Sequence, residues 1–366
     1  MTTSGTVPAG SDPGARPTGD EPDVPGPPSR SPGRRWVRRG VGLVVLLIVI
    51  EYGIVPLLAD VDSVREAVRG VQAWWFVPGV ALEALSILAY GLYTRALLGR
   101  AGRPPLSRVV RIDLTTWGAG HVLPGGPAGT AALRYRLLTD AGVGRSDAVL
   151  LAGVQGVVSA MILHVILWAA LLIAIPLHGG IRLVELAVVI GLVAAADVLL
   201  VTVVAPRGLG RVGPALRRVA ARIHATWVRQ LERQSRDVVE QVRRIGRDRR
   251  RLALATTWAG LNWLLDAAAL EVFLLALGQP VDPVGVLVGF GLASTLGVLP
   301  ITPGGIGVVE GVLVPALVAF GVPAAPALVA VLGWRVVSFW LPVPAGLLSY
   351  LSLRLDIPAP DRHARR

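Results

Sequence analysis

The stretch GVLPITPGGIGVVEG, from Gly297 to Gly311, decides the fold of this chain because it interrupts an otherwise apolar segment. It carries two prolines, five glycines and Glu310 among mostly apolar residues. Proline removes a backbone donor and clashes with the preceding turn, while glycine adopts conformations that other residues resist. A Pro-Gly-Gly at membrane depth therefore breaks a helix, and the freed backbone must be buried in protein or line a wet cavity.

The composition of the whole chain is that of a membrane protein. Of its 366 residues, 53% are hydrophobic and only 16% are charged, against about 25% charged residues in soluble domains. Six mostly apolar stretches are long enough to cross a hydrocarbon core of roughly 30 Å. These stretches cover residues 37–58, 74–98, 148–176, 183–205, 252–277 and 325–353. The sequence predicts an all-α polytopic membrane protein with six full spans.

The arginines indicate the orientation of the spans. Arg34, Arg35, Arg38 and Arg39 immediately precede the first span, which places the N-terminus in the cytoplasm by the positive-inside rule. Residues 206–251 contain fourteen arginines and four acids, so we expect a cytoplasmic loop there. This clustering between spans explains the net charge of +12 and argues against a nucleic-acid-binding protein.

The two ends of the chain differ from its middle. Residues 1–33 are rich in Pro, Gly, Ser and Asp and predict a disordered cytoplasmic tail. Residues 354–366 are basic and predict a second cytoplasmic tail, which leaves 34–353 as the transmembrane domain. Cysteine is absent, so no disulfide or thiolate metal site is available. Arginine without lysine, together with much Ala, Gly, Val and Pro, is typical of a GC-rich genome and indicates a bacterial cell membrane.

The Pro-Gly-Gly motif occurs twice in similar surroundings. GAGHVLPGGPAGTAALR begins at Gly118 and GVLPITPGGIGVVEGVL begins at Gly297, and in both five residues separate the first glycine from the Pro-Gly-Gly. In each case two spans precede the motif and one follows, which predicts two four-element halves, 37–176 and 182–353. The arginines place the first hairpin on the cytoplasmic side and the second outside. We therefore expect an inverted repeat, each hairpin being re-entrant or a pair of short helices.

Each break also suggests a binding site. Transporters built from inverted repeats place broken helices at the substrate site, where half-helix N-termini face anionic groups. The runs after Gly125-Gly126 and Gly304-Gly305 would each begin a half-helix whose free N–H groups and positive dipole end hold an anion. The alternative is a packing kink or a hairpin turn that binds no ligand.

Two arginines lie close to these breaks. An ionisable side chain at the bilayer centre costs at least roughly 2.5–3.5 kcal/mol, so each one needs a reason. Arg335, about ten residues into the last span, is the best candidate for a phosphate contact, with an ion pair to Asp266 or Glu310 as the alternative. Arg134 follows the first break by about two turns and either faces the same cavity or snorkels to the cytoplasmic surface.

Several acidic and amide side chains accompany the arginines. Glu310, in the first turn of the second half-helix, either offsets the dipole or binds a substrate amine or a proton. Asn262 and Asp266 are four residues apart and share one helix face. Asp266 is interpreted as a proton-relay or amine-binding residue, unless it pairs with Arg335. Glu83 is an isolated acid in the second span, suited to an inter-helix bond.

Two further residues flank the first break. His121 precedes the Pro-Gly-Gly and Thr130 follows it. Both side chains are able to donate hydrogen bonds to phosphate oxygens. We include them among the candidate substrate contacts.

The segments LPGGPAGTAALRYRLL, PITPGGIGVVEGVLVPAL and GWRVVSFWLPVPAGLLSYL resemble the flippase-like membrane family. That family includes the transmembrane part of lysylphosphatidylglycerol synthases, and the resemblance covers roughly residues 37–353. Its members are associated with moving lipids, notably aminoacylated phosphatidylglycerol. The chain has no room for the soluble aminoacyl-transferring domain, so the resemblance implies lipid translocation without synthase chemistry. It implies phospholipid partners, a separate cytoplasmic lipid-modifying enzyme and no cofactor or metal.

Two alternatives compete with the transporter hypothesis. Asp60 and Asp62 lie just outside the first span, where polyprenyl-sugar glycosyltransferases place catalytic acids and a metal, although the outer loops here are short. A non-transporting scaffold would instead use the arginine-rich 206–251 loop to recruit a cytoplasmic synthase. HExxH, Walker and nucleophile-elbow motifs are absent from the sequence, so other hydrolase and ATPase functions are not supported.

Overall fold

The computed structural model confirms an all-helical fold in the part of the chain that it describes. It covers Thr2 and residues 61–70, 72–98, 103–122, 126–179, 181–199, 248–297 and 302–355, and no strand occurs among them. Every described helix belongs to one compact unit, Leu43–Arg366. The predicted first span (37–58), the tail 1–33 and most of the 206–251 loop lie outside the described residues.

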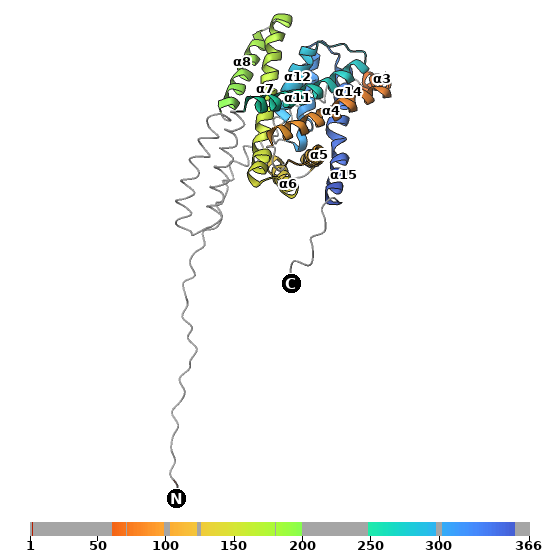
Figure 1. Ribbon diagram of the computed structural model, residues 1–366. Coiled ribbons are helices and arrows are strands. Elements are labelled where there is room, and N and C mark those ends of the chain that lie inside the picture. The colour runs from red at the N-terminus through yellow and green to blue at the C-terminus, as the bar shows by residue number, and fades with distance from the viewer. Residues whose placement is uncertain are drawn as a thin grey trace. The chain divides into compact units, whose positions relative to one another are not determined.

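Figure 1 labels the described helices in chain order. Residues 61–178 contain α3 (Val61–Gly70), the short 3-10 turn η2 (Ala73–Trp75), α4 (Phe76–Leu97), α5 (Leu106–Val122), α6 (Gly126–Asp140) and α7 (Arg145–His178). Residues 181–355 contain α8 (Ile181–Leu199), α11 (Arg249–Ala276), α12 (Pro283–Gly297), the 3-10 turn η4 (Pro303–Gly305), α13 (Val308–Ala319), α14 (Ala324–Arg335), the π-helical turn η5 (Val336–Trp340) and α15 (Pro342–Leu355).

Four helical segments of the described chain are long and apolar enough to cross a membrane. They are α4, α7, α11 and the continuous segment Ala324–Leu355, which joins α14, η5 and α15. They coincide with the predicted spans 74–98, 148–176, 252–277 and 325–353. The apolar part of α8, Leu183–Ala196, is shorter.

Four short helices bracket the two Pro-Gly-Gly motifs. α5 ends and α6 begins at the first motif, and α12 and α13 flank the second. With 12 residues, α13 extends about 18 Å at 1.5 Å per residue, well short of a hydrocarbon core of roughly 30 Å. The predicted interruption is confirmed at Pro303–Gly305, while residues 123–125 of the first motif lie outside the described chain.

The contacts between helices follow a reciprocal pattern. α4 packs along α11, which is the most extensive contact between described helices. α5 packs on α15, the end of the last span of the second half, and α12 packs on α7, the last span of the first half. α5 and α12 thereby contact spans that are far from them in the chain, and α5 also reaches η4 at the second break.

The close approach of α5 and α15 depends on two glycines. A Cβ on Gly118 would lie 2.5 Å from the carbonyl oxygen of Pro342, and a Cβ on Gly346 would lie 2.7 Å from that of Leu114. Small residues allow the backbones of membrane helices to touch, which replaces the hydrophobic driving force that lipid does not provide. The two glycines therefore set how closely the first half packs on the last span.

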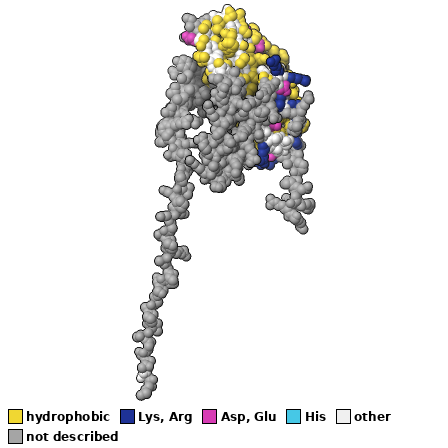
Figure 2. All heavy atoms as spheres, turned by 60° about the vertical axis from the view of Figure 1, so that its left-hand side comes forward, with side chains coloured by type: hydrophobic (Ala, Val, Ile, Leu, Met, Phe, Trp, Pro, Cys, Tyr) yellow, Lys and Arg dark blue, Asp and Glu magenta, His cyan; other side chains and the backbone are white. Residues whose placement is uncertain are grey.

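The outer surface is apolar and fits a hydrocarbon solvent. Figure 2 shows hydrophobic side chains covering the described upper part of the molecule in that view, with arginines gathered beside it. Large apolar side chains are exposed on α8, where Leu192 is 66% exposed, and on α15, where Leu348 is 68% exposed. Polar residues such as Gln155 and Asn262 are buried instead, the reverse of the arrangement expected in water.

We expect Gly346→Val to destabilise the fold by about 1–3 kcal/mol, because the added side chain collides with the backbone of α5. Gly153→Val on α7 is the matched control, since a Cβ there has no neighbour within 4 Å. Thermal unfolding of the purified proteins in one detergent compares the two. Equal melting temperatures would show that the α5–α15 contact does not limit stability.

Candidate functional site

The second break has a glycine-built geometry. Gly304 and Gly305 have φ of +62° and +70°, and Gly307 follows with +82°. This left-handed region disfavours residues with a Cβ. Gly307 is the N-cap of α13, so the half-helix begins at Val308, two residues later than the motif alone indicates.

Glu310 occupies the positive end of α13. Its Oε2 accepts a hydrogen bond from the backbone N–H of Gly307 at 2.7 Å. Its Oε1 lies 2.6 Å from Nε of Arg335, and Nη2 of Arg335 donates to the carbonyl of Gly304 at 3.3 Å. A carboxylate at this position satisfies a free donor and offsets the helix dipole, as the sequence predicts. Arg335 takes the predicted ion-pair alternative with Glu310 as its partner.

Aromatic rings from both halves surround this ion pair. The guanidinium of Arg335 lies 4.5 Å from the ring centroid of Phe339. His121, in the last turn of α5, stacks on the same phenylalanine with centroids 4.1 Å apart. Phe339 belongs to the π-helical turn η5, which begins directly after Arg335, and π-turns are frequent at functional sites. The end of α5 and the second break therefore meet at one place.

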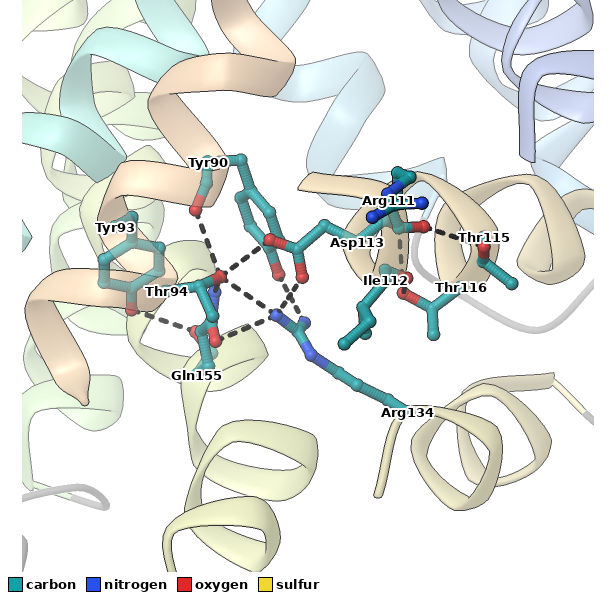
Figure 3. Close-up of polar contacts among 10 residues, drawn as sticks. All are labelled: Tyr90, Tyr93, Thr94, Arg111, Ile112, Asp113, Thr115, Thr116, Arg134 and Gln155. Atoms are coloured by element: carbon teal, nitrogen blue, oxygen red, sulfur yellow. Dashed lines mark hydrogen bonds and ion pairs between the residues drawn. The ribbon is translucent and has the colours of Figure 1, made fainter. Parts of the chain in front are cut away.

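Arg134 is the centre of a second polar cluster, formed by four helices (Figure 3). Its Nη2 donates to Asp113 Oδ1 at 2.5 Å and to Thr94 Oγ1 and Gln155 Oε1 at 3.1 Å each. Its Nη1 donates to the Tyr90 hydroxyl at 3.1 Å. α6 supplies the arginine, and α4, α5 and α7 supply its partners. Of the two alternatives for Arg134, snorkelling is wrong, because the side chain is 9% exposed and paired.

The partners of Arg134 also bind one another. The Thr94 hydroxyl donates to Asp113 Oδ2, and Gln155 Nε2 donates to the Thr94 hydroxyl, both at 2.9 Å. The Tyr93 hydroxyl donates to the backbone carbonyl of Gln155 at 3.1 Å. Buried charges are stable only when paired and hydrogen-bonded in this way. The Arg134 cluster thus ties four helices together through its side chains.

The sequence analysis missed most of this cluster. Asp113 and Thr94 were not among the candidate residues, although Asp113 is the only acid between Arg111 and Arg134. An acid in a membrane segment that also contains an arginine is a signal for a buried pair. The partner itself depends on how α5, α6 and α4 pack, which the sequence does not show.

The other candidate residues make different contacts or lie outside the described residues. Asp266 does not pair with Arg335 within 4 Å; its Oδ1 accepts from Trp334 Nε1 at 2.8 Å. Thr130 lies next to Gly120: a Cβ added to that glycine would be 3.3 Å from the Thr130 methyl group. Asn262 binds Ser86 on α4.

Some predicted positions are described only in part. Gly126 begins α6, while Gly125 lies outside the described residues. Asp60 also lies outside them, and of Asp62 only the backbone, within α3, is described. Among the described residues, no group of three or more His, Asp or Glu side chains is arranged to hold a metal ion.

A family model described as the lysylphosphatidylglycerol synthase TM region matches residues 41–346. The chain belongs to this family. The match includes both Pro-Gly-Gly motifs, Arg134 and Arg335. The predicted resemblance is therefore confirmed, and the chain is an integral membrane protein of the lysylphosphatidylglycerol synthase TM-region family.

One curated relative is similar over a shorter segment. It is described as a UPF0104 membrane protein from Methanothermobacter thermautotrophicus and is 33% identical over 88 residues. The alignment spans 24% of this chain and 26% of that relative. Because it covers about a quarter of each protein, it supports membership of a membrane-protein family and nothing about the activity.

We expect Asp113→Ala to destabilise the protein by about 3–5 kcal/mol, because it leaves the buried Arg134 guanidinium without its counter-charge. Replacing both partners, with Asp113→Leu and Arg134→Met, should cost less than the single change. Arg136→Ala is the control on α6: that side chain is 69% exposed, and exposed pairs contribute about 0–1 kcal/mol. Denaturant unfolding in detergent measures all three. A double variant less stable than Asp113→Ala would contradict the pairing.

Proposed function

We propose that this protein moves a phospholipid headgroup across the cell membrane, with Arg335 and Glu310 as its binding residues. The observation that carries the proposal is their ion pair at the broken helix, where Nε and Oε1 are 2.6 Å apart. The pair lies at the N-terminus of α13, and a helix N-terminus is an anion-binding feature. A buried pair without a ligand role would need neither the break nor the left-handed glycines.

The pair supplies both charges that an aminoacylated or zwitterionic headgroup requires. A phosphate would replace the Glu310 carboxylate on Arg335, since guanidinium binds both groups with the same planar donors. The released Glu310 carboxylate, 20% exposed in its side chain, would then accept the substrate ammonium. Binding exchanges one ion pair for two, so the site is electrically satisfied with and without lipid.

The proposed architecture has six spans and an inverted repeat. The support comes from the order of helices, a span, two short helices around a Pro-Gly-Gly and a second span, which occurs twice. The reciprocal contacts, α5 with α15 and α12 with α7, are those that a two-fold relation between halves produces. The first hairpin would open toward the cytoplasm and the second toward the outside.

In this proposal the partners are membrane phospholipids, and the chain itself catalyses no reaction. The arginine-rich loop 206–251 is attracted to anionic headgroups by roughly 1 kcal/mol per basic residue near the surface. The N- and C-termini would be cytoplasmic, where a separate lipid-modifying enzyme supplies the substrate. The family match supports a lipid-handling role and leaves the identity of the lipid to experiment.

Arg335→Ala should reduce translocation of a fluorescent phospholipid at least tenfold in proteoliposomes, because the phosphate loses its counter-charge. Glu310→Gln should reduce translocation of lysylphosphatidylglycerol much more than that of phosphatidylglycerol, since only the former carries ammonium groups. Dithionite quenching of the labelled lipid follows the rate. The amount of inserted protein is measured for each variant, and the translocation rate is compared per inserted protein.

Arg354→Ala is the matched control for that experiment. Arg354 lies near the end of α15, is exposed and contacts Tyr350. It should translocate lipid at the wild-type rate. Undiminished translocation by Arg335→Ala would exclude the proposed headgroup site.

Labelling of single cysteines tests the inverted orientation, and the native chain is already free of cysteine. Asp140→Cys, at the end of α6, should react with an impermeant maleimide only from the cytoplasmic side. Ala324→Cys, at the start of α14, should react only from outside. Both positions are exposed, so a difference in labelling between them would reflect the side of the membrane on which each lies. Labelling of both from one side would contradict the inversion.

A further inference from the structure

The crossing of α4 and α11 encloses two carboxyl groups outside the proposed lipid site. Glu83 on α4 is 2% exposed and Asp266 on α11 is 8% exposed. Neither takes part in the Arg134 cluster or in the Arg335–Glu310 pair. Each is an acid in the middle of a membrane-spanning helix, which needs a partner or a function.

The contacts on both sides make the two carboxyls face each other. One turn from Glu83, the Ser86 hydroxyl accepts from Asn262 Nδ2 at 2.7 Å and donates to the Asn262 carbonyl at 3.0 Å. One turn in the other direction lies Gly79, where a Cβ would be 2.8 Å from the ring of Phe273. The helices thus run in opposite directions.

Glu83 and Asp266 occupy the interval between these two contacts. Glu83 is three residues before Ser86, and Asp266 is four residues after Asn262. On antiparallel helices these positions lie one turn along from the Ser86–Asn262 contact, on the same side of the crossing. The two buried carboxyl groups accordingly face each other in the crossing of α4 and α11.

The two acids differ in the hydrogen bonds that their carboxyl oxygens accept. Asp266 Oδ1 accepts the indole N–H of Trp334 at 2.8 Å. Both oxygens of Glu83 are buried with no hydrogen-bond partner among the described residues. An ionised carboxylate is only an acceptor, so an ionised Glu83 would be a buried charge with no donor, which is strongly unfavourable.

The surrounding charges do not neutralise the pair. Arg335 on α14, the residue after Trp334, is paired with Glu310 on α13 and forms no ion pair with Asp266. The α11 and α4 neighbours, Asn262 and Ser86, are neutral. Since no cation among the described residues forms an ion pair with either carboxyl group, a proton is required to limit their negative charge.

We propose that Glu83 and Asp266 form a proton-binding site within the membrane, in which Glu83 is protonated and donates a hydrogen bond to the Asp266 carboxylate. The protonated Glu83 supplies the donor that its surroundings lack, and Asp266 remains the acceptor because Trp334 already donates to it. Two adjacent carboxyl groups sharing one proton are a stable arrangement, since both do not ionise at close range. Uptake of the proton from water converts one carboxylate to an acid.

A covalent link joins this site to the proposed lipid site. Trp334 binds Asp266 and the next residue, Arg335, binds Glu310. A movement of α14 that opens one contact therefore changes the other. Resting on the proposed function, this connection would couple proton release to headgroup binding.

Infrared spectroscopy of the full-length protein in nanodiscs tests the site without any transport assay. At neutral pH the wild type should show a carboxylic-acid C=O stretching band that shifts in D2O. Glu83→Gln, which has nearly the same shape, should lose this band. Asp266→Asn should retain it at a shifted frequency, because the acceptor changes from a carboxylate to an amide.

Glu185→Gln is the matched control, since Glu185 is exposed on α8, and it should keep the band. A band of unchanged intensity in Glu83→Gln would overturn the proposal. So would its loss in Asp266→Asn with retention in Glu83→Gln, which places the proton on the other acid. Loss of the wild-type band when sodium replaces choline would identify a metal-cation site instead.

Translocation provides a separate measurement. The lipid flux of the wild type should depend on the pH difference across proteoliposomes, and Glu83→Gln should lose that dependence. Flux independent of pH in both proteins would overturn the coupling while the infrared band still tests the proton site. Absence of any flux in the wild type would contradict the proposed function and leave the infrared result intact.

Discussion

The structure depends on pairing every polar group that a broken helix frees inside the membrane. Hydrocarbon provides no hydrogen-bond partner, so the exposed backbone at Pro303–Gly305 must be satisfied by the protein. Glu310 does this for the N–H of Gly307, and Arg335 does it for the carbonyl of Gly304 while neutralising Glu310. One ion pair thereby stabilises the broken helix, and the proposed function assigns headgroup binding to the same pair.

The same constraint explains the second cluster. Arg134 follows the first break, and its Nη groups are satisfied by Asp113, Thr94, Gln155 and Tyr90. The two arginines differ in their surroundings: Arg134 is tied to four helices, whereas Arg335 pairs with a partly exposed acid at a helix end. In the proposed function a ligand would displace one carboxylate at Arg335, whereas at Arg134 it would have to disrupt a whole network. This difference favours Arg335 as the arginine that exchanges partners in the proposed function and Arg134 as a structural residue.

Much of the fold follows from the sequence, and the site follows only in part. Apolar length predicts α4, α7, α11 and the last span, and the Pro-Gly-Gly motif predicts the break that η4 shows. Glu310 was correctly placed at a helix start and offered as a partner of Arg335. The pairing of Arg134 with Asp113, and the facing of Glu83 and Asp266, were not predicted, because both depend on how separate helices rotate and pack against one another.

The sequence by itself determined that lipid surrounds the helices and where the helices are interrupted. The length of each apolar run requires lipid, and proline and glycine forbid a continuous helix. The tertiary structure alone decided which charges meet. Helix faces are set by a period of 3.6 residues, but the rotation and register of one helix against another depend on side-chain packing, as Ser86 on Asn262 and Gly118 on Pro342 show. A rotation of one helix by a single residue would direct Glu83 or Arg335 toward lipid, where no partner exists.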